Sequence, residues 1–343
     1  MHMRTLAIET SCDDTSIAIV TNDRWVFEVE KILAYSQIAE HQKFWWVVPE
    51  LASRLHSEKI IALLQTIGLE EIPNVDFISV TTEPGLPGSL VVGKTVWFEL
   101  GAFYDKEVVP IHHILGHMFS ILLERKLEDL QFPLVILTAS WWHNDIYVVE
   151  DGEKTIEGDY PTFMFAWFSV TRVWWTLDDA AWECFDKVSR MLWGPYPGGV
   201  RISEKASKGK KNQLVQFKRI FLSHDKFEFS FSWMKSQVTF LLEKLNKEGI
   251  ELDEQLVCDI AYDFQEAVVE VMAKKLIHAG EQFWAKTLAL AWGVSANNRL
   301  CEITKELLEK KHKEIPLFIP AKKLYSTDNW AMIWVVGLLS MRK

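Results

Sequence analysis

Two similar stretches of sequence constrain the fold of this 343-residue chain more than any other feature. In residues 6–20, two short apolar segments flank a polar turn, a pattern that predicts a β-hairpin. Residues 134–149 repeat this order, again with a polar bend between two apolar segments. Alternating helix and strand patterns follow each stretch, which favours a duplicated α/β domain. The spacing by itself leaves a second interpretation open, namely two unrelated hairpins.

The remaining periodicity supports an α/β chain of about two domains, since a domain commonly has roughly 150 residues. Helices are expected at 47–68, 90–104, 176–193 and 256–279, from about 113, from about 294 and near the C-terminus, with strands at 77–80, 108–111 and 287–291. No low-complexity linker separates the domains. We expect an N-terminal domain over 1–131 and a C-terminal domain over 132–343. An arrangement in which the last helix of the C-terminal domain packs on the N-terminal domain is left open.

Composition and charge disfavour several classes of protein. The formal net charge is −10, from 47 acidic and 37 basic residues, which disfavours coating of nucleic acid by bulk charge but allows a local basic patch. The four cysteines form no CxxC pair, which indicates a reduced, cytoplasmic chain. No apolar run approaches the ~18 residues of a membrane span, and the first apolar segment is too short for a signal-peptide core. We therefore expect no membrane association.

Two histidines carry the clearest chemical pattern. His113 and His117 are spaced i and i+4, so on a helix they share one face and can hold one metal ion. Asp328 stands where a helix cap is expected and is a candidate third ligand, and such a set suits Fe(II) or zinc with open positions. The zinc-protease motif is absent, because Ile114 occupies the place of its catalytic glutamate. The alternative is a pair of partly buried histidines without a metal.

Several turns resemble elements that hold phosphate groups. The turns at 10–15 and 139–143, the glycines at 198–199 and the helix start near Asn297 can direct backbone N–H groups at an anion. Carboxylates that could bind ribose, a metal or an amine are Asp13, Asp178, Asp179 and Asp186. The alternative for each turn is an ordinary loop, and for each carboxylate a helix cap or a surface charge.

A basic run covers residues 205–219, which contain lysines and arginines but no acidic residue. Such a run is usually a solvated loop and less often the contact surface for an anionic partner. Within it, Lys208, Lys210 and Lys211 are our candidates for contact with RNA.

Motifs spread over nearly the whole chain occur in a recognisable order. They lie at residues 8–15 (Ile-Glu-Thr-Ser-Cys-Asp-Asp-Thr), 41–54, 83–86, 112–117, 140–143, 176–181, 185–188, 196–199, 229–232, 293–297 and 327–329. In identity and order they resemble the TsaD family, also called Gcp, of tRNA adenosine threonylcarbamoyltransferases. The resemblance implies the α/β actin/Hsp70/sugar-kinase (ASKHA) superfold, with two duplicated RNase H-like domains and a cleft between them.

The resemblance also implies a set of site residues. A metal, Fe(2+) or alternatively Zn, is expected on His113, His117 and Asp328, with Glu9 and Asp13 in catalytic or supporting roles. A nucleotide-like ligand is expected at Ala139, Ser140, Trp141, Trp142, His143, Asp186, Gly199 and Asn297.

The reaction that the resemblance implies is the transfer of a threonylcarbamoyl group. The donor is threonylcarbamoyl-AMP, the acceptor is N6 of the tRNA adenosine beside the anticodon, and AMP is the leaving group. The implied metal polarises the carbamoyl carbonyl and orients the mixed anhydride. The implied partners are tRNA, a degenerate paralogue resembling TsaB, and an ATPase resembling TsaE.

Tryptophan is the one departure from the family pattern. The chain has 16 Trp and 16 Gly, and three Trp pairs stand at 45–46, 141–142 and 174–175. The clearest positions at which the family has glycine are Trp45, Trp46, Trp141, Trp142, Trp174, Trp182, Trp233 and Trp292. Tryptophan cannot supply the left-handed backbone or the close approach that glycine allows. We therefore hypothesise that most or all of the 16 represent glycine, through UGA codons that some bacteria read as glycine and a common alternative code reads as tryptophan.

Two other functions compete with the transferase. One is a non-catalytic scaffold resembling TsaB, which the presence of His113 and His117 disfavours. The other is a small-molecule kinase of the same superfold, which the turns alone would allow but which does not need the set of two histidines and Asp328.

Overall fold

The structure is a computed structural model that describes residues 2–23, 26–139, 144–219, 228–326, 328 and 330–341. The chain divides into two compact units, each described by itself below. Unit 1 comprises Met1–Gln131 together with Ile319–Lys343, and unit 2 comprises Phe132–Phe318. The segment from 319 onward, for whose last helix we left open packing on the first domain, belongs to unit 1.

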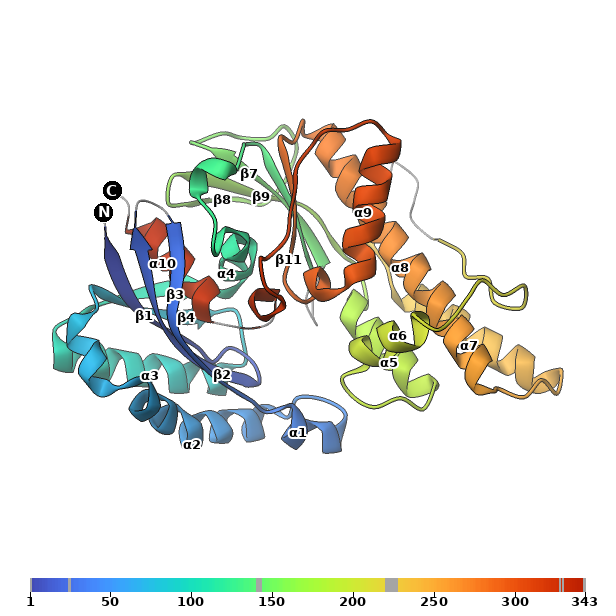
Figure 1. Cartoon of the computed structure of the whole chain (residues 1–343), viewed down its shortest axis with the longest axis horizontal. Helices are drawn as coiled ribbons and strands as arrows, with labels where there is room; N and C mark the ends of the chain where they lie inside the picture. Colours follow the sequence, from blue (N-terminus) through green and yellow to red (C-terminus); the bar gives the residue numbers. More distant parts are fainter. Residues whose placement is uncertain are drawn as a thin grey trace. The chain divides into compact units, whose positions relative to one another are not determined.

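Among the described residues, the sheet of unit 1 has five strands in the order β3-β2-β1-β4-β5, of which Figure 1 labels β1 to β4. The first three pair antiparallel, and β4 and β5 continue the sheet in parallel with β1. Their bounds are Met3–Glu9, Asp14–Asp23, Val26–Ser36, Phe77–Glu83 and Glu107–His112. The apolar segment Leu6-Ala7-Ile8 of β1 is fully buried, because β1 lies at the centre of the sheet.

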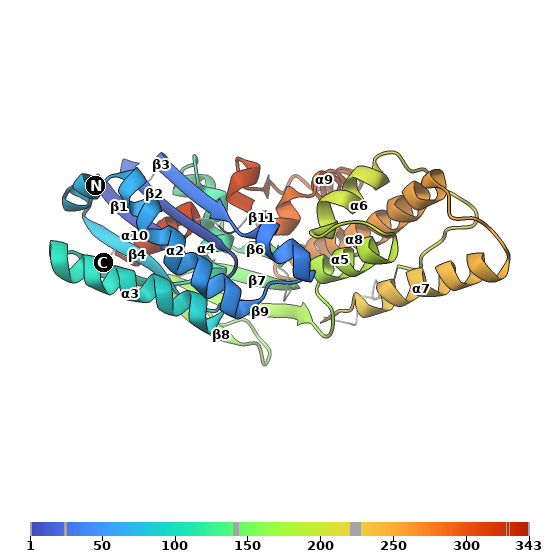
Figure 2. The ribbon, with the colours of Figure 1, turned by 90° about the horizontal axis from the view of Figure 1, so that it is seen from below.

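Helices cover both faces of this sheet. They are α1 (Ile38–His41), α2 (Pro49–Ile67), α3 (Pro87–Tyr104), α4 (His113–Phe119) and α10 (Trp330–Ser340). The pair α2 and α3 packs against β2 to β5 on one face, and α10 contacts β1, β2, β4 and β5 on the other (Figures 1 and 2). Residues 331–335 of α10 are fully buried, so the returning segment completes the core of unit 1.

Unit 2 repeats the strand order of unit 1. Its sheet runs β10-β9-β7-β6-β11-β12, with β8 paired to β9. The bounds are Leu134–Ala139 (β6), Asn144–Asp151 (β7), Thr162–Phe165 (β8), Phe168–Thr176 (β9), Glu228–Phe229 (β10), Thr287–Ala291 (β11) and Leu317–Phe318 (β12). The series β9-β7-β6-β11-β12 has the same two antiparallel and two parallel pairings as β3-β2-β1-β4-β5. The predicted duplication of an α/β domain is therefore confirmed.

In the part of unit 2 that the structure describes, five α-helices accompany this sheet. They are α5 (Ala181–Met191), α6 (Gly198–Ala206), α7 (Ser232–Lys247), α8 (Glu254–Gln282) and α9 (Asn298–Lys310). Short 3-10 helices of the chain are η1 (Gln42–Phe44), η2 (Leu69–Asn74), η3 (Ser120–Leu122), η4 (Leu127–Asp129), η5 (Gly293–Ala296) and η6 (Lys323–Ser326). No helix in the described ranges combines the length and apolarity that crossing a bilayer requires.

The expected helix over 176–193 is wrong at its start. Thr176 ends β9, and α5 begins only at Ala181. The acidic pair that suggested a first helical turn has other partners. Asp178 accepts hydrogen bonds from the backbone N–H groups of Phe231 and Ser232, where α7 begins, at 2.9 and 3.2 Å. The carboxylate thus holds the start of a helix about fifty residues further along the chain.

Candidate functional site

The end of β5 and the start of α4 position the two histidines in unit 1. Strand β5 ends at His112, and α4 begins at His113. His113 and His117 therefore lie one turn apart on the same face of α4, and both are buried. Asp328 comes from the returning segment just before α10. One ligand atom from each of these three residues lies within 4.8 Å of the other two.

The three ligand atoms converge on one point. His117 Nε2 is 2.9 Å from Asp328 Oδ1, His113 Nε2 is 3.6 Å from the same oxygen, and the two Nε2 atoms are 3.2 Å apart. Ligands that each lie about 2.0–2.2 Å from one ion are roughly 3–3.6 Å from one another. The spacing and the mixed nitrogen and oxygen donors therefore fit a single transition-metal ion.

A buried carboxylate fixes the orientation of His113. Glu9, the last residue of β1, places Oε2 3.1 Å from His113 Nδ1, and Ser11 Oγ lies 3.1 Å from the same nitrogen. Thr81 Oγ1 donates to Glu9 Oε2, and the Ser11 N–H donates to Glu9 Oε1, both at 2.5 Å. An Nδ1–H held by Glu9 leaves the lone pair on Nε2, which faces Asp328.

The protonation state of His117 suits metal binding. Burial opposes a charge on Glu9, but the neighbouring His113 outweighs it, so the pKa of Glu9 is lowered. Burial also opposes a charge on His113, and the carboxylates of Glu9 and Asp328 outweigh it and raise its pKa. Burial, reinforced by His113, lowers the pKa of His117 to about 4. At neutral pH His117 is therefore a neutral imidazole, the form that binds a metal.

Further carboxylates lie near Asp328. Burial and the charge of Asp328 raise the pKa of Asp13 to about 6. Burial and the charge of Asp13 raise the pKa of Asp14 to about 7. Carboxylates that repel one another in this way are stabilised by a nearby cation, so Asp13 is placed where it can support a metal centre.

The expected ligand residues of unit 2 gather at two helix starts. On α5, Asp186 accepts a hydrogen bond from the Gly198 N–H at the first residue of α6. Burial raises the pKa of Asp186 to about 7, although the N–H groups of Gly198 and Gly199 oppose this. Its other oxygen, Oδ2, is buried, and no described residue hydrogen-bonds to it. This carboxylate is available to a ligand at the start of α6.

Asn297 connects the second helix start to the first. Its side chain accepts the Leu300 N–H at 3.2 Å and so caps α9. Its Nδ2 donates to Gln265 Oε1 at 3.2 Å, and Ser203 Oγ of α6 donates to the same oxygen at 2.9 Å. Gln265 and Ser203 were missed by the sequence analysis, because their hydrogen bonds join α6, α8 and α9 and leave no local pattern.

We call the region formed by Asp186, Gly199, Gly293 and Asn297 the cradle.

An indole occupies the cradle. A Cβ atom added to Gly199 would overlap the ring of Trp182, and one added to Gly293 would lie 2.5 Å from Trp182 Nε1. The ring therefore lies against the backbone of both glycines. Of the remaining predicted ligand residues, Ala139 is buried at the end of β6. Ser140, Trp141, Trp142 and His143 lie outside the described residues.

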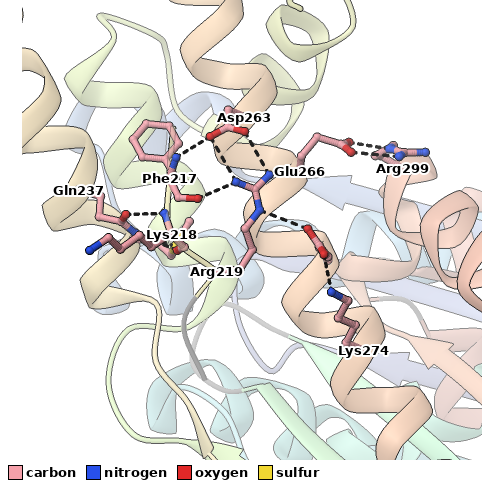
Figure 3. Close-up of polar contacts among 10 residues, drawn as sticks. Phe217, Lys218, Arg219, Gln237, Asp263, Glu266, Lys274 and Arg299 are labelled. Atoms are coloured by element: carbon pink, nitrogen blue, oxygen red, sulfur yellow. Dashed lines mark hydrogen bonds and ion pairs between the residues drawn. The ribbon is translucent and has the colours of Figure 1, made fainter. Parts of the chain in front are cut away.

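The basic run over 205–219 is not the fully solvated loop that we considered. Lys205 is buried in α6 and pairs with Glu254 of α8. Arg219 pairs with Asp263 at 3.1 Å (Figure 3) and also with Glu270 at 3.2 Å. Our RNA candidates, in contrast, are exposed; they are Lys208, Lys210 and Lys211.

Carboxylates of α8 hold the backbone of this run. Asp259 accepts the Lys210 N–H at 2.9 Å and Asn212 Nδ2 at 2.8 Å. One turn later, Asp263 accepts the Phe217 N–H at 2.6 Å (Figure 3). The exposed lysines are therefore carried on a segment fixed to a long helix.

Comparison with known proteins identifies the family. The sequence profile of TsaD, tRNA N6-adenosine threonylcarbamoyltransferase, matches residues 28–335. A protein of this name from Syntrophomonas wolfei is 37% identical over 334 residues, covering 96% of this chain and 89% of its own. The protein of this name from Mesoplasma florum is 37% identical and covers 96% of this chain and 96% of its own. The one from Bacillus subtilis is 36% identical and covers 99% of this chain and 91% of its own.

Solved structures show the same fold. HypF from T. kodakarensis has a TM-score of 0.57 at 12% identity, over 98% of this chain and 47% of its own. A ROK family protein from Streptococcus pneumoniae, solved with sucrose, has a TM-score of 0.50 at 12% identity, over 96% of this chain and 97% of its own. The expected ASKHA-type fold is thus confirmed, and the scaffold and kinase alternatives are not favoured. The chain belongs to the TsaD family, the tRNA N6-adenosine threonylcarbamoyltransferases.

Proposed function

We propose that this chain transfers the threonylcarbamoyl group of threonylcarbamoyl-AMP to N6 of the tRNA adenosine beside the anticodon and releases AMP. The observation that carries the proposal is the convergence of His113, His117 and Asp328, supported by Glu9, in a member of the TsaD family. A tRNA substrate implies that the reaction takes place in the cytoplasm.

The metal centre takes Fe(2+), with zinc as the alternative. Two imidazoles and one carboxylate leave coordination positions open, as in non-haem iron sites, and the same donors are also found around catalytic zinc. When bound, the ion supplies a Lewis acid that polarises an acyl oxygen of the substrate. His113 and His117 offer Nε2 lone pairs, Asp328 supplies the negative charge, and Glu9 retains the proton on His113 Nδ1.

The cradle in unit 2 takes the AMP part of the donor. The first N–H groups of α6 and α9 can bind an anion, because helix N-termini carry unpaired donors and a partial positive charge. Asp186 Oδ2 is available to accept a hydrogen bond from a ribose hydroxyl. Gln265 and Ser203 keep Asn297 at the start of α9. The nucleotide then leaves as AMP from a site that already complements it.

The tRNA and the protein partners bind to surfaces outside the metal centre and the cradle. Lys208, Lys210 and Lys211 contact phosphates of the tRNA, since they are exposed on a segment that α8 holds in place. A TsaB-like paralogue binds the exposed face of α3. There Val91 and Phe98 are 60% and 62% exposed, and apolar side chains of this kind mark contact sites. A TsaE-like ATPase acts with both proteins.

A transfer assay tests the proposed function. The chain made in its own host is supplied with threonylcarbamoyl-AMP, tRNA and the partner proteins, and modified adenosine is measured per tRNA. His117→Ala should abolish transfer, because only two ligands then remain, whereas His312→Asn removes an exposed imidazole at the end of α9 and should change nothing. Undiminished transfer by His117→Ala, or no modified adenosine from the unaltered chain, would contradict the proposal.

A further inference from the structure

The C-terminal end of α7 shows how helices in this protein stop. Gly249 adopts a left-handed conformation with φ of +70°. Its N–H donates to Asn246 O at 3.2 Å, and the N–H of Ile250 donates to Leu245 O at 2.9 Å. These two bonds form a Schellman motif, in which the left-handed residue is usually glycine because a Cβ atom is unfavourable there.

Helices α5 and α8 stop in the same way, but with tryptophan. Trp193 has φ of +53°, and its N–H and that of Gly194 bond to Arg190 O and Ser189 O at 3.1 and 2.8 Å. Trp284 has φ of +48°, with bonds from its N–H to Glu281 O at 3.4 Å and from the Ala285 N–H to Gly280 O at 2.8 Å. The two indoles are 76% and 82% exposed, so little packing offsets the unfavourable backbone.

Left-handed tryptophans are frequent in this chain. Trp45, after η1, has φ of +64°, and Trp292, directly after β11, has φ of +71°. Among the described residues, tryptophan accounts for four of the eight non-glycine residues with positive φ, although it fills only 16 of 343 positions. A bulky side chain is a rare outlier in this conformation. The backbone at these four positions is therefore that of glycine.

Two buried tryptophans lack a hydrogen-bond acceptor for the indole N–H among the described residues. Trp97 of α3 and Trp334 of α10 are fully buried, and in the described part of unit 1 the Nε1–H of each has no hydrogen-bond partner. A buried indole N–H ordinarily finds an acceptor, because leaving it unpaired is costly. This observation does not depend on backbone conformation.

The cradle supplies a third observation. Trp182 and Asp186 are four residues apart on α5, so both lie on the helix face directed at the start of α6. The indole fills the space against Gly199 and Gly293, next to the carboxylate whose Oδ2 no described residue engages. Glycine at position 182 would empty this space beside that oxygen.

We infer that the protein made in its own host carries glycine at positions 45, 182, 193, 284 and 292, and that glycine at 182 opens the cradle to the nucleotide part of the donor. The second half of this inference rests on the proposed function. One codon with a different meaning, UGA read as glycine, would account for all five positions and for the other tryptophans of the sequence.

Peptide mass spectrometry of the chain purified from its own host tests the residue identities directly. The peptides that contain positions 182, 193 and 284 should each have the mass of the glycine form, and the corresponding codons should be UGA. Tryptophan at any of these three positions would overturn the inference.

The stability of recombinant chains tests the backbone argument without any ligand. Trp193→Gly combined with Trp284→Gly should raise the melting temperature by several degrees, because glycine relieves an unfavourable φ at both helix ends. Trp233→Gly is the matched control. Trp233 is 48% exposed but lies in the first turn of α7, where glycine disfavours the helix and should lower the melting temperature. A lower melting temperature for the double variant would overturn the argument.

Calorimetry with AMP tests the opening of the cradle. AMP should bind the Trp182→Gly chain at least tenfold more tightly than the unaltered chain, whereas Trp284→Gly, away from the cradle, should leave binding unchanged. Glycine-containing native peptides together with no gain for Trp182→Gly would refute the nucleotide site in the proposed function but not the residue identities. Equal binding by all three chains together with tryptophan in the native peptides would refute the inference itself.

Discussion

The candidate metal site of unit 1 and the cradle of unit 2 differ in how much each depends on side chains. In the metal centre, side chains supply the ligand atoms, and buried polar groups such as Glu9 and Ser11 hold them. In the cradle, the backbone of two glycines, Gly199 and Gly293, lies beside the side chains of Asp186 and Asn297. The candidate metal site requires particular side chains, whereas the cradle requires that Gly199 and Gly293 have none.

This difference explains why the tryptophans affect the two sites unequally. The two histidines and Asp328 converge although Trp334 lies in the neighbouring helix α10. A single indole, that of Trp182, lies against both glycines of the cradle. The indole of Trp182 therefore affects the cradle directly, because Gly199 and Gly293 leave no side chain in its way.

The largest effect, on metal affinity, should come from removing the carboxylate of Asp328. Asp328→Ala leaves two imidazoles without the negative ligand, so metal affinity should fall by more than about 100-fold. If the sites are independent, AMP binding by a chain that also carries Trp182→Gly should not change. Metal content and calorimetry measure both quantities, and the exposed Glu128→Ala serves as control. Full retention of metal by Asp328→Ala would remove this residue from the centre.

A smaller loss of metal affinity is expected when the residues that hydrogen-bond to the metal ligands are changed. Glu9→Gln keeps an acceptor near His113 Nδ1 but removes the charge, which should weaken metal binding by about 10- to 100-fold. Thr81→Ser preserves the hydroxyl that donates to Glu9 and should leave affinity near that of the unaltered chain. Competition with a chelator measures these affinities. Equal affinities for Glu9→Gln and Thr81→Ser would show that Glu9 does not orient His113.

The buried carboxylate of the cradle should make stability depend on pH. The pKa of Asp186 is about 7 in the folded chain against an ordinary value of 3.8, so between these values only the unfolded chain has lost the proton. Stability should therefore fall as pH rises through this window, by about 1.4 kcal/mol per pH unit from this group. Denaturant unfolding of Asp186→Asn should show a shallower decline than the unaltered chain. Identical slopes would contradict the raised pKa.

The smallest effect concerns the exposed lysines. Replacing Lys208, Lys210 and Lys211 with glutamine should reduce the salt dependence of tRNA binding, by up to about 0.9 in log–log slope for each phosphate that a lysine no longer neutralises. A triple replacement of the exposed residues Lys305, Lys310 and Lys313 provides a control of equal charge change. Filter binding at several salt concentrations measures the slope. An unchanged slope in the first variant would exclude this segment from the RNA surface.

Local patterns in the sequence predicted much of the fold but less of the site. The hairpins and the spacing of His113 and His117 are visible because period and burial are encoded within a few residues. The hydrogen bond between Glu9 and His113 spans 104 residues, and that between Asn297 and Gln265 spans 32, so no periodicity reveals them. The same limit misplaced the start of α5, because Asp178 caps a distant helix.

The return of residues 319–343 to unit 1 has a consequence during synthesis. All of unit 2 leaves the ribosome before Asp328 and the buried residues 331–335 of α10 are available to unit 1. Until then, the first 131 residues have neither a complete core nor a complete set of metal ligands. A chain released before residue 328 therefore contains all of unit 2 but lacks residues that unit 1 buries. Completion of the cluster of His113, His117 and Asp328 thereby distinguishes a nascent chain that has been translated this far from one that has stopped early.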